Sequence, residues 1–248
     1  NYLPTGGLPQ GDKLPTTNYL ILIPVALFSL AVVYFTAVVP YKANAAAIQF
    51  YAHSEQGYYK ESLPFLEKAF SIQSPYTTWE VRKRAGWQFS NVLEYEVRED
   101  TDPGKLAVIK DIYEFMTDEL EKFIEARPSD PQMYYVLGRT YRLGSEKLGY
   151  DDLDKASAVF QKAFQYSDLR VEYFNEFAKV LLLQGKFKEA EQVVKDYVSR
   201  VRFQEYFPHV TLGHFYFVAG KHEQAFEQYE KAREAGYAFV DVVPEYSR

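Results

Sequence analysis

The 248-residue sequence contains no cysteine, and this absence excludes three classes of chemistry at once. Disulfide bonds, thiolate catalysis and cysteine-ligated zinc all require the sulfur atom that the chain lacks. Basic runs of five or more residues are missing too, and the formal net charge is −6. Because nucleic-acid binding requires clustered Lys and Arg to neutralise phosphates, the sequence predicts no nucleic-acid partner.

Histidine is scarce, and its spacing does not favour a metal site. The four histidines are His53, His209, His214 and His222. His209 and His214 are five residues apart, which places them on different faces of one helix instead of at the i, i+4 spacing of helical metal ligands. No glycine-rich phosphate loop, nucleophile elbow or zinc-helix motif occurs. The sequence therefore predicts no catalytic residues, no metal and no cofactor, and favours a protein that is not an enzyme.

Charge is missing from one long stretch, which predicts a membrane-spanning helix. From Tyr19 to Val39 the sequence runs YLILIPVALFSLAVVYFTAVV, 21 residues without a charged side chain. A helix of that length spans roughly 30 Å, the thickness of the hydrocarbon core of a bilayer. A cleavable signal sequence is the alternative, because the Ala-rich stretch from Ala43 to Ala47 resembles a cleavage site. Lys13 and Lys42 balance each other across the segment, so the side of the membrane stays open.

Beyond Ala43 the pattern changes to paired amphipathic helices, and two segments are similar to each other. They are FNEFAKVLLLQGKFKEAEQVVKDYV, from Phe174 to Val198, and HVTLGHFYFVAGKHEQAFEQYEKAR, from His209 to Arg233. The two segments lie 35 residues apart, and each has a Gly-Lys pair with an Ala five residues after the Gly. A period close to this is typical of paired-helix solenoids.

These segments resemble tetratricopeptide (TPR) repeats. That family has small residues at positions 8, 20 and 27, aromatic residues at 11 and 24, and a turn near 15. In the last repeat these positions hold Gly213, Ala225, Ala232, Tyr216, Tyr229 and Gly220. The preceding segment matches more loosely, with Ala178, Ala190, Tyr197, Leu181, Val194 and Gly185. The resemblance implies an all-α fold in which stacked hairpins bury a shared core.

The predicted fold is thus all-α, with one N-terminal transmembrane helix followed by a TPR-like solenoid of helical hairpins. Residues 1–17 are predicted to form a linker or leader, 18–41 the transmembrane helix and 42–76 a first TPR-like repeat. Residues 77–128 are predicted to form a divergent helical hairpin. Three repeats and a C-terminal tail are expected from 129 to 248.

The resemblance also implies a concave groove, because first-helix positions 2, 5, 9 and 12 of such repeats face one side. On this sequence those positions predict a protein-binding groove lined by Gln132, Tyr135, Arg139, Arg142, Asn175, Lys179, Phe207, His214 and Phe217. The groove would join a basic strip to an aromatic end, a combination typical of peptide-binding surfaces. The expected ligand is an acidic or carbonyl-rich segment of another protein.

The leading functional hypothesis is a single-pass membrane scaffold that mediates protein–protein interaction or assembly, with the bilayer contacted through Tyr19 to Val39. A wider resemblance gives an alternative. The spanning helix, its Asn-Ala-rich exit and the later sequence from Trp79 to Arg82 are similar to the C-terminal region of bacterial O-antigen ligase-like proteins. That resemblance implies the tail of a polytopic membrane enzyme and favours an extracytoplasmic location for the repeats. A structural subunit of a large membrane assembly is the third hypothesis.

Overall fold

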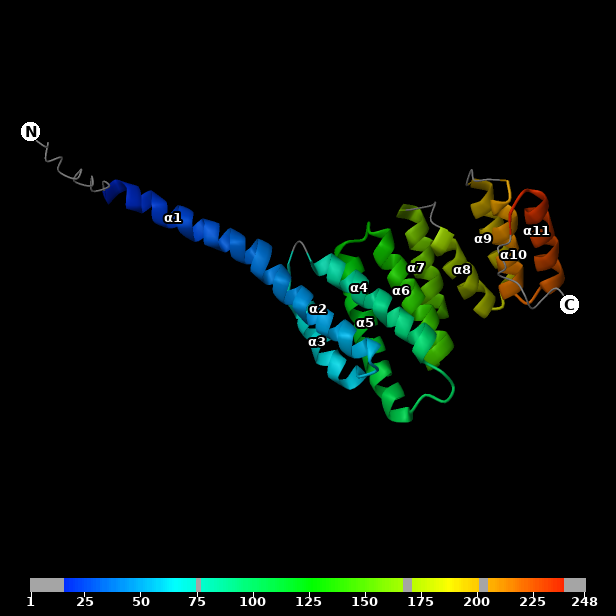
Figure 1. The fold of residues 1–248 in the computed structure, drawn as a ribbon, viewed down its shortest axis with the longest axis horizontal. Coiled ribbons are helices and arrows are strands. Elements are labelled where there is room, and N and C mark those ends of the chain that lie inside the picture. Colours follow the sequence, from blue (N-terminus) through cyan, green and yellow to red (C-terminus); the bar gives the residue numbers. More distant parts are fainter. Residues whose placement is uncertain (1–15, 75–76, 167–170, 201–204, 239–248) are drawn as a thin grey trace, which may run out of the picture.

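The computed structural model describes residues 16–74, 77–166, 171–200 and 205–238, and every regular element in these ranges is helical. At the N-terminus, α1 (Thr16–Val33), the π turn η1 (Tyr34–Val38) and α2 (Val39–Glu55) form one unbroken helix (Figure 1). The other α-helices are α3 (Tyr59–Ser71), α4 (Thr78–Asn91), α5 (Pro103–Ala126), α6 (Pro131–Leu143), α7 (Leu153–Tyr166), α8 (Val171–Leu183), α9 (Phe187–Arg200), α10 (Phe207–Val218) and α11 (His222–Glu234). Two further π turns, η2 (Val92–Glu96) and η3 (Gly144–Leu148), extend α4 and α6. The predicted all-α fold class is confirmed. Of the predicted linker, residues 1–15 lie outside the described residues, and Thr16 and Thr17 belong to α1.

Consecutive helices pack as hairpins that stack along the molecule. The pairs α2–α3, α6–α7, α8–α9 and α10–α11 make the most extensive contacts, and α2, α4, α6 and α8 follow one another in one layer (Figure 1). Between them, α4 packs mainly on α2 and α6, and α5 mainly on α3 and α6. The chain therefore has the TPR-like repeat fold that its sequence predicts.

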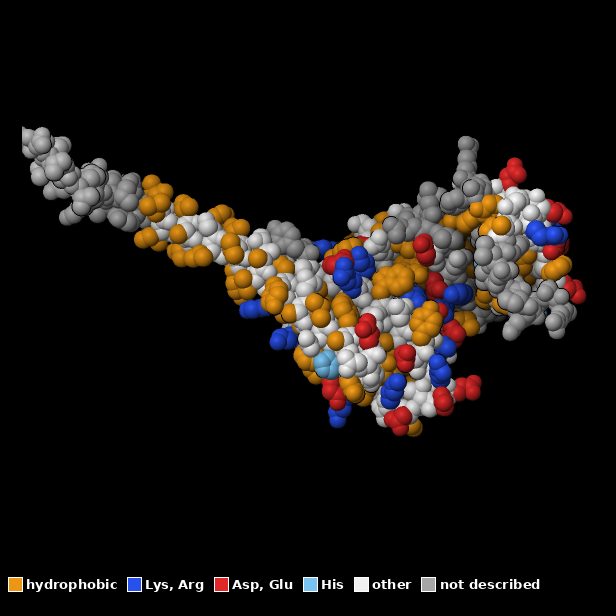
Figure 2. Space-filling view, in the orientation of Figure 1, with side chains coloured by type: hydrophobic (Ala, Val, Ile, Leu, Met, Phe, Trp, Pro, Cys, Tyr) orange, Lys and Arg blue, Asp and Glu red, His pale blue; other side chains and the backbone are white. Residues whose placement is uncertain are grey.

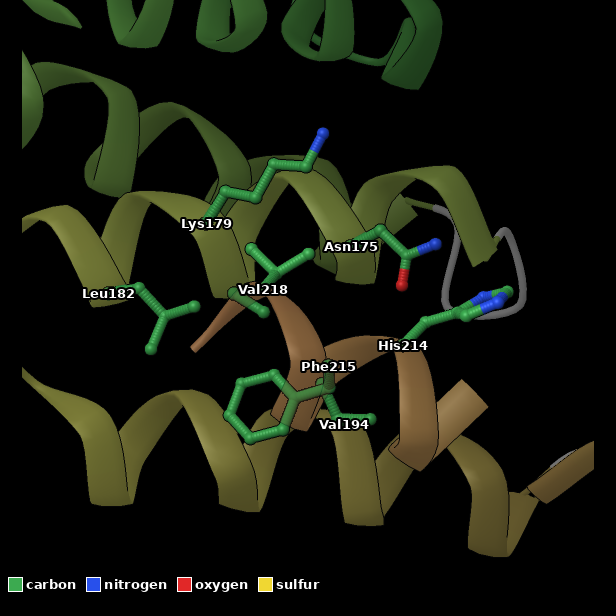
Figure 3. A pocket seen from close by; sticks show the side chains of 8 residues that line it. Asn175, Lys179, Leu182, Val194, His214, Phe215 and Val218 are labelled. Carbon is green, nitrogen blue, oxygen red and sulfur yellow. The ribbon is translucent and has the colours of Figure 1, made fainter. Parts of the chain in front are cut away.

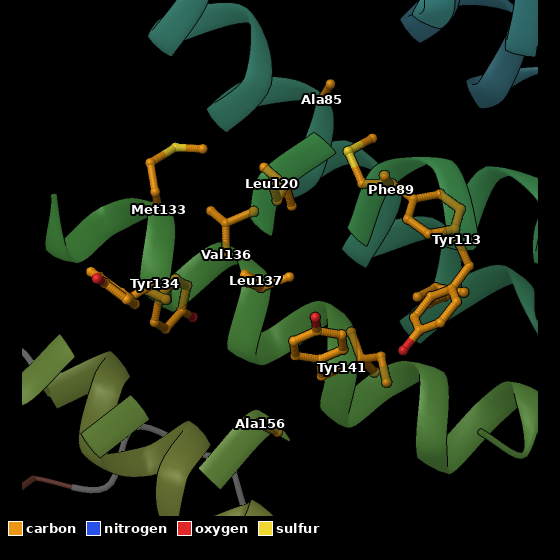
Figure 4. Packing of buried hydrophobic residues seen from close by; sticks show 14 of the residues in the cluster. Ala85, Phe89, Tyr113, Leu120, Met133, Tyr134, Val136, Leu137, Tyr141 and Ala156 are labelled. Carbon is orange, nitrogen blue, oxygen red and sulfur yellow. The ribbon is translucent and has the colours of Figure 1, made fainter. Parts of the chain in front are cut away.

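The core is continuous across the hairpins, and large side chains fill the spaces between helices. Figure 4 shows Leu120 of α5 and Phe89 of α4 near Val136 of α6, and all three are buried. Further along α6, Tyr141 lies over Ala156 of α7. Stacking thus lets each hairpin bury the apolar face that it cannot bury alone.

Small residues at the predicted positions allow the helices of a hairpin to approach closely. A Cβ atom on Gly138 would lie 2.8 Å from the Phe160 ring, and one on Gly213 would lie 2.5 Å from the Tyr229 ring. Gly213 and Tyr229 occupy positions 8 and 24 of the repeat pattern. Gly138 and Phe160 make the same contact in the α6–α7 hairpin, where they are 22 residues apart instead of 16 because η3 lengthens the connection. The repeat register read from the sequence therefore agrees with the packing.

Replacing Gly138 with alanine is expected to lower the free energy of unfolding. Phe160 is fully buried, so its ring cannot move aside into solvent, and overpacking should cost about 1–3 kcal/mol. Alanine's better helix propensity offsets up to about 1 kcal/mol of this cost. Gly104 of α5 is the control, because a Cβ there would meet only the exposed side-chain oxygen of Asp102, at 3.1 Å, and no buried ring, so Gly104→Ala should change the stability much less than Gly138→Ala. Urea unfolding followed by circular dichroism compares the two; equal midpoints would contradict the packing described here.

The long N-terminal helix has two halves with opposite surroundings. From Ile21 to Val38 every side chain is exposed, and this part stands clear of the helical domain (Figure 1; orange in Figure 2). In α2, by contrast, Ala43, Ala47 and Phe50 are buried in the core. The helix is long and apolar enough to cross a membrane, a test that a signal sequence also passes.

The helix stays continuous through Pro40, which a regular α-helix accommodates poorly. A proline ring clashes with the carbonyl group four residues earlier and cannot donate a backbone hydrogen bond. The π turn Tyr34–Val38 ends two residues before Pro40 and includes Thr36, the residue four positions before the proline, so the backbone is widened where the clash would occur. The exposed segment is therefore joined to the first hairpin by helical backbone without an intervening loop.

Candidate functional site

A cavity of about 280 Å³ lies between α8, α9 and α10, on the layer of first helices. It is lined by Asn175, Ala178, Lys179, Leu182, Val194, His214, Phe215 and Val218. Figure 3 shows Asn175 and His214 at one end, with Phe215 and Val194 in the centre and Leu182 at the other end. The cavity therefore has an apolar floor and a few polar groups at its rim.

The spacing of residues in α8 explains this arrangement. Asn175, Lys179 and Leu182 follow one another at i, i+4 and i+7, so they share one face of the helix. Most other side chains of α8, from Tyr173 to Leu181, are buried against the neighbouring helices. On α10, His214 and Val218 are likewise four residues apart and point to the same cavity.

The structure brings three of the predicted groove residues together. These are Asn175, Lys179 and His214. Phe217 is 41% exposed, and its ring lies 5.5 Å from the His222 ring instead of in the cavity lining. Phe207 is half-buried at the start of α10, with its ring 6.4 Å from that of Tyr197.

Two more predicted residues lie on α6, away from this cavity. Tyr135 is buried, and its ring stacks on Tyr173 at 4.9 Å and lies 5.3 Å from Trp87. Burial raises the pKa of Tyr135 above its ordinary value. Gln132 is half-buried in the first turn of α6, where its backbone N–H donates to the capping carboxylate of Asp130 at 3.0 Å. Tyr135 therefore packs between helices, whereas at Gln132 it is the backbone N–H and not the side chain that takes part in the Asp130 cap.

Arg139 is buried and held by groups of α4 and η2. Its guanidinium donates to the Glu94 carboxylate and, at 3.1 Å, to the side-chain oxygen of Asn91. The same group lies over the Trp87 ring, 4.9 Å from its centroid. Burial raises the pKa of Glu94, but the hydrogen bond from Arg139 and nearby positive charges outweigh this effect, so its pKa is lowered.

Arg142 is buried more deeply and is shared between two carboxylates. Its Nε donates to Glu176 at 2.7 Å and its Nη1 to Glu146 at 2.6 Å. Glu176 also accepts from Lys179 at 2.9 Å, and Glu94 lies 4.0 Å from Arg142. Arg139, Arg142 and Lys179 thus face the three carboxylates Glu94, Glu146 and Glu176. The basic strip expected from the sequence is neutralised within the chain.

The histidines have ordinary local partners. Partial burial lowers the pKa of His214, whose ring lies edge-on to Tyr229 at 5.6 Å. The ring of His209 shares a hydrogen bond of 2.9 Å with Gln228. Within the described ranges no group of three or more His, Cys, Asp or Glu side chains is placed to hold a metal ion.

Comparison with known proteins gives fold-level similarities. No protein-family model and no curated protein matches the chain. Among solved structures, MamA in a form titled MSR-1 is 20% identical, covers 78% of this chain and 95% of its own, and has a TM-score of 0.44. A thermophilic TPR protein from Thermus thermophilus is 16% identical over 78% of this chain and 91% of its own, with a TM-score of 0.47. At these identities and TM-scores, the similarities add nothing to what the hairpins themselves show.

Proposed function

We propose that this chain is a membrane-anchored scaffold whose cavity between α8 and α10 binds an extended segment of another protein. The observation that carries the proposal is the cavity itself, an apolar depression in the layer of first helices with polar groups at its rim. Such a site takes one apolar side chain of a peptide and orients its main chain through hydrogen bonds.

Because internal carboxylates neutralise the basic strip, the peptide ligand is not expected to be strongly acidic. Arg139 and Arg142 are occupied by internal carboxylates, so they offer little net charge to an acidic ligand. Asn175 is exposed and carries both a donor and an acceptor, which suits it to the backbone of an extended peptide. We therefore expect an apolar anchor residue in the ligand, with recognition of carbonyl groups and not of dense negative charge.

Burial of the Ala-rich stretch from Ala43 to Ala47 supports an N-terminal helix that is retained as a membrane anchor. Ala43 and Ala47 are 1% and 3% exposed, because they pack inside the first hairpin. Cleavage of a signal sequence there would remove or truncate part of α2 that belongs to the core. Retention of the exposed helix is more consistent with this packing, and membrane attachment would raise the effective concentration of partners at the surface.

A change at the cavity wall tests the binding site. Val218 is 59% exposed at the cavity, and Val218→Asp places a carboxylate where an apolar anchor would be desolvated. Peptides selected from a display library on the wild-type protein should bind this variant roughly tenfold more weakly or worse, a loss of about 1.4 kcal/mol.

Phe226→Asp is the matched control, since Phe226 is 62% exposed on α11 and does not line the cavity. Its affinity for the same peptides should equal that of the wild type. Equal affinity of all three proteins would place peptide binding on another surface, and failure to select any peptide would argue against a peptide-binding scaffold.

A further inference from the structure

A second cavity, of about 500 Å³ and named here the cavity of α3, α4 and α5, is lined by α4, by the end of α5 and by the residues just after α3. Its chemical character differs from that of the first cavity. Its lining is Gln73, Ser74, Thr78, Arg82, Glu119, Lys122, Phe123, Ala126 and Arg127. Three of these side chains are cationic and one is anionic, and Asp118, which pairs with Lys122, adds a second carboxylate. Three cations against two carboxylates leave an excess of one positive charge in a chain whose net charge is −6. Such a cavity fits an anionic ligand of moderate size.

The cations of this cavity differ in how far they are neutralised. Arg82 is buried and bonds to Glu119 at 3.0 Å, while Lys122 is shared between Asp118 at 2.5 Å and Glu119 at 3.3 Å. Arg127 has no carboxylate partner within the described ranges, and its guanidinium lies 5.4 Å from the Phe123 ring. Arg127 is therefore the cation that is free of carboxylates within the described ranges. Lys122 is already paired, but its side chain is 61% exposed, so a ligand can reach it.

The position of the cavity relative to the exposed helix indicates which class of anionic ligand it meets. The hairpin of α2 and α3 turns at Gly57, so Ser71, 14 residues after the turn, stands level with Ala43, 14 residues before it. Ala43 is five residues beyond Val38, the last residue of the fully exposed segment, which is about 7–8 Å of helix. The headgroup layer of a bilayer is roughly 5–8 Å thick on each side.

Gln73, Ser74 and Thr78 thus lie at the level of lipid headgroups if the exposed segment spans the hydrocarbon core. Figure 1 shows that α3 ends and α4 begins beside the first turns of α2. Figure 2 shows several separate Lys and Arg side chains, some beside acidic ones, near the place where the apolar helix meets the helical domain. Tyr41, 74% exposed one turn after the segment, is of the type that sits at membrane interfaces.

We propose that the cavity of α3, α4 and α5 binds the phosphate-bearing headgroup of an anionic phospholipid in the bilayer that the N-terminal helix spans. Arg127 and Lys122 contact the phosphate, and Phe123 contributes apolar contact beside it. Because the helix has no loop between the membrane and α2, a bound headgroup fixes the rotation of the repeats about the helix axis and so the direction in which the peptide cavity faces. This inference rests on the membrane anchor of the proposed function.

The test uses the full chain in non-ionic detergent micelles with equimolar phosphatidylglycerol and phosphatidylcholine, and counts the retained lipids by native mass spectrometry. The wild type should retain phosphatidylglycerol selectively. The variant Lys122→Ala with Arg127→Ala should lose about fivefold to thirtyfold of this selectivity, as expected from removing one to two cationic contacts at a lipid surface. The control Lys231→Ala with Arg233→Ala removes the same charges from exposed positions on α11 and should keep it.

Three outcomes overturn the inference. They are equal retention of the two lipids by the wild type, equal loss of selectivity in the control, and full displacement of the lipid by millimolar inorganic phosphate, which would identify a free-phosphate site. A chain that carbonate removes from bilayers would instead refute the anchor and with it the proposed function.

The two tryptophans report on the orientation independently of any charge. Trp79 lies in the first turn of α4, and Trp87 is eight residues, or about 12 Å, further from the headgroup level. With a headgroup spin-labelled lipid in vesicles, Trp79 of the Trp87→Phe variant should be quenched more than Trp87 of the Trp79→Phe variant. The reverse order, or no quenching of either, would show that the cavity does not face the bilayer.

Discussion

Replacing Arg142 with methionine should lower the free energy of unfolding by about 3–5 kcal/mol, the cost of breaking a buried ion pair from one side. Arg142 is 3% exposed and binds both Glu176 and Glu146. Methionine preserves much of the side-chain volume, so the loss measures what the two carboxylates lose with the guanidinium. Glu146 then has no ion-pair partner within the described ranges, and Glu176 keeps only the 36%-exposed Lys179. Glu176 matters most, because its side chain is only 8% exposed.

Two further variants separate electrostatics from packing. Lys179→Met removes a cation from the same carboxylate at a side chain that is 36% exposed, so it should cost about 1 kcal/mol or less. Adding Glu176→Gln to Arg142→Met should restore part of the lost stability, because the buried negative charge is then gone. Urea unfolding of the wild type, of the two single variants and of the double variant gives the four free energies of unfolding. An Arg142→Met midpoint equal to that of Lys179→Met would contradict the buried network.

The pH dependence follows from the same network. The folded-state pKa of Glu94 lies below its ordinary value of 4.5, since Arg139 and its neighbours stabilise the carboxylate more than burial disfavours it. A carboxyl group whose pKa is lower in the folded protein than in the unfolded chain stabilises the fold at pH values above its unfolded-state pKa. This stabilisation is lost as the pH falls through the folded-state pKa. We therefore expect wild-type stability to fall below about pH 4.5, and Glu94→Gln to show a shallower fall.

Much of the fold was predictable from the sequence, because its determinants are local. Helical periodicity, a repeat of fixed length and small residues at fixed positions can all be read within one segment. Gly213 and Tyr229 show this directly, since they meet in the structure as the repeat pattern requires. The absence of charge between Tyr19 and Val39 likewise predicted the exposed apolar helix.

The charge pairing of the arginines in the predicted groove could not be read from the sequence, because it joins distant residues. Glu94 lies 45 residues before Arg139, and Glu176 lies 34 residues after Arg142. Nothing in a repeat pattern gives these pairings, so the arginines were expected to face a ligand. Glu146, four residues after Arg142, was the one partner that helical spacing alone would have revealed. The cavity of α3, α4 and α5 was also missed, since it forms between helices of the divergent hairpin and the repeat before it.

Placing arginine at both Leu27 and Leu30 should abolish carbonate-resistant membrane association if the N-terminal helix is an anchor. These side chains are 61% and 66% exposed near the middle of the exposed segment. An arginine at the centre of a spanning helix costs about 2.5–3.5 kcal/mol, so two should cost roughly 5–7 kcal/mol. That penalty is comparable to the gain from the remaining Leu, Ile, Phe and Val side chains, which contribute only about 0.3–0.6 kcal/mol each.

The matched control places the same two charges on apolar residues exposed within the helical domain. Ile48 and Tyr58 are 58% and 55% exposed, so Ile48→Arg with Tyr58→Arg should leave the protein in the membrane fraction. Carbonate extraction followed by immunoblotting compares the two, and the mass of the wild-type chain tests the signal-sequence alternative. A wild-type chain that begins after Ala47 would show cleavage within α2 and contradict the anchor. The expected result is a full-length wild-type chain and release from the membrane only when Leu27 and Leu30 are replaced by arginine. That result would mean that the exposed helix holds the repeats at the bilayer.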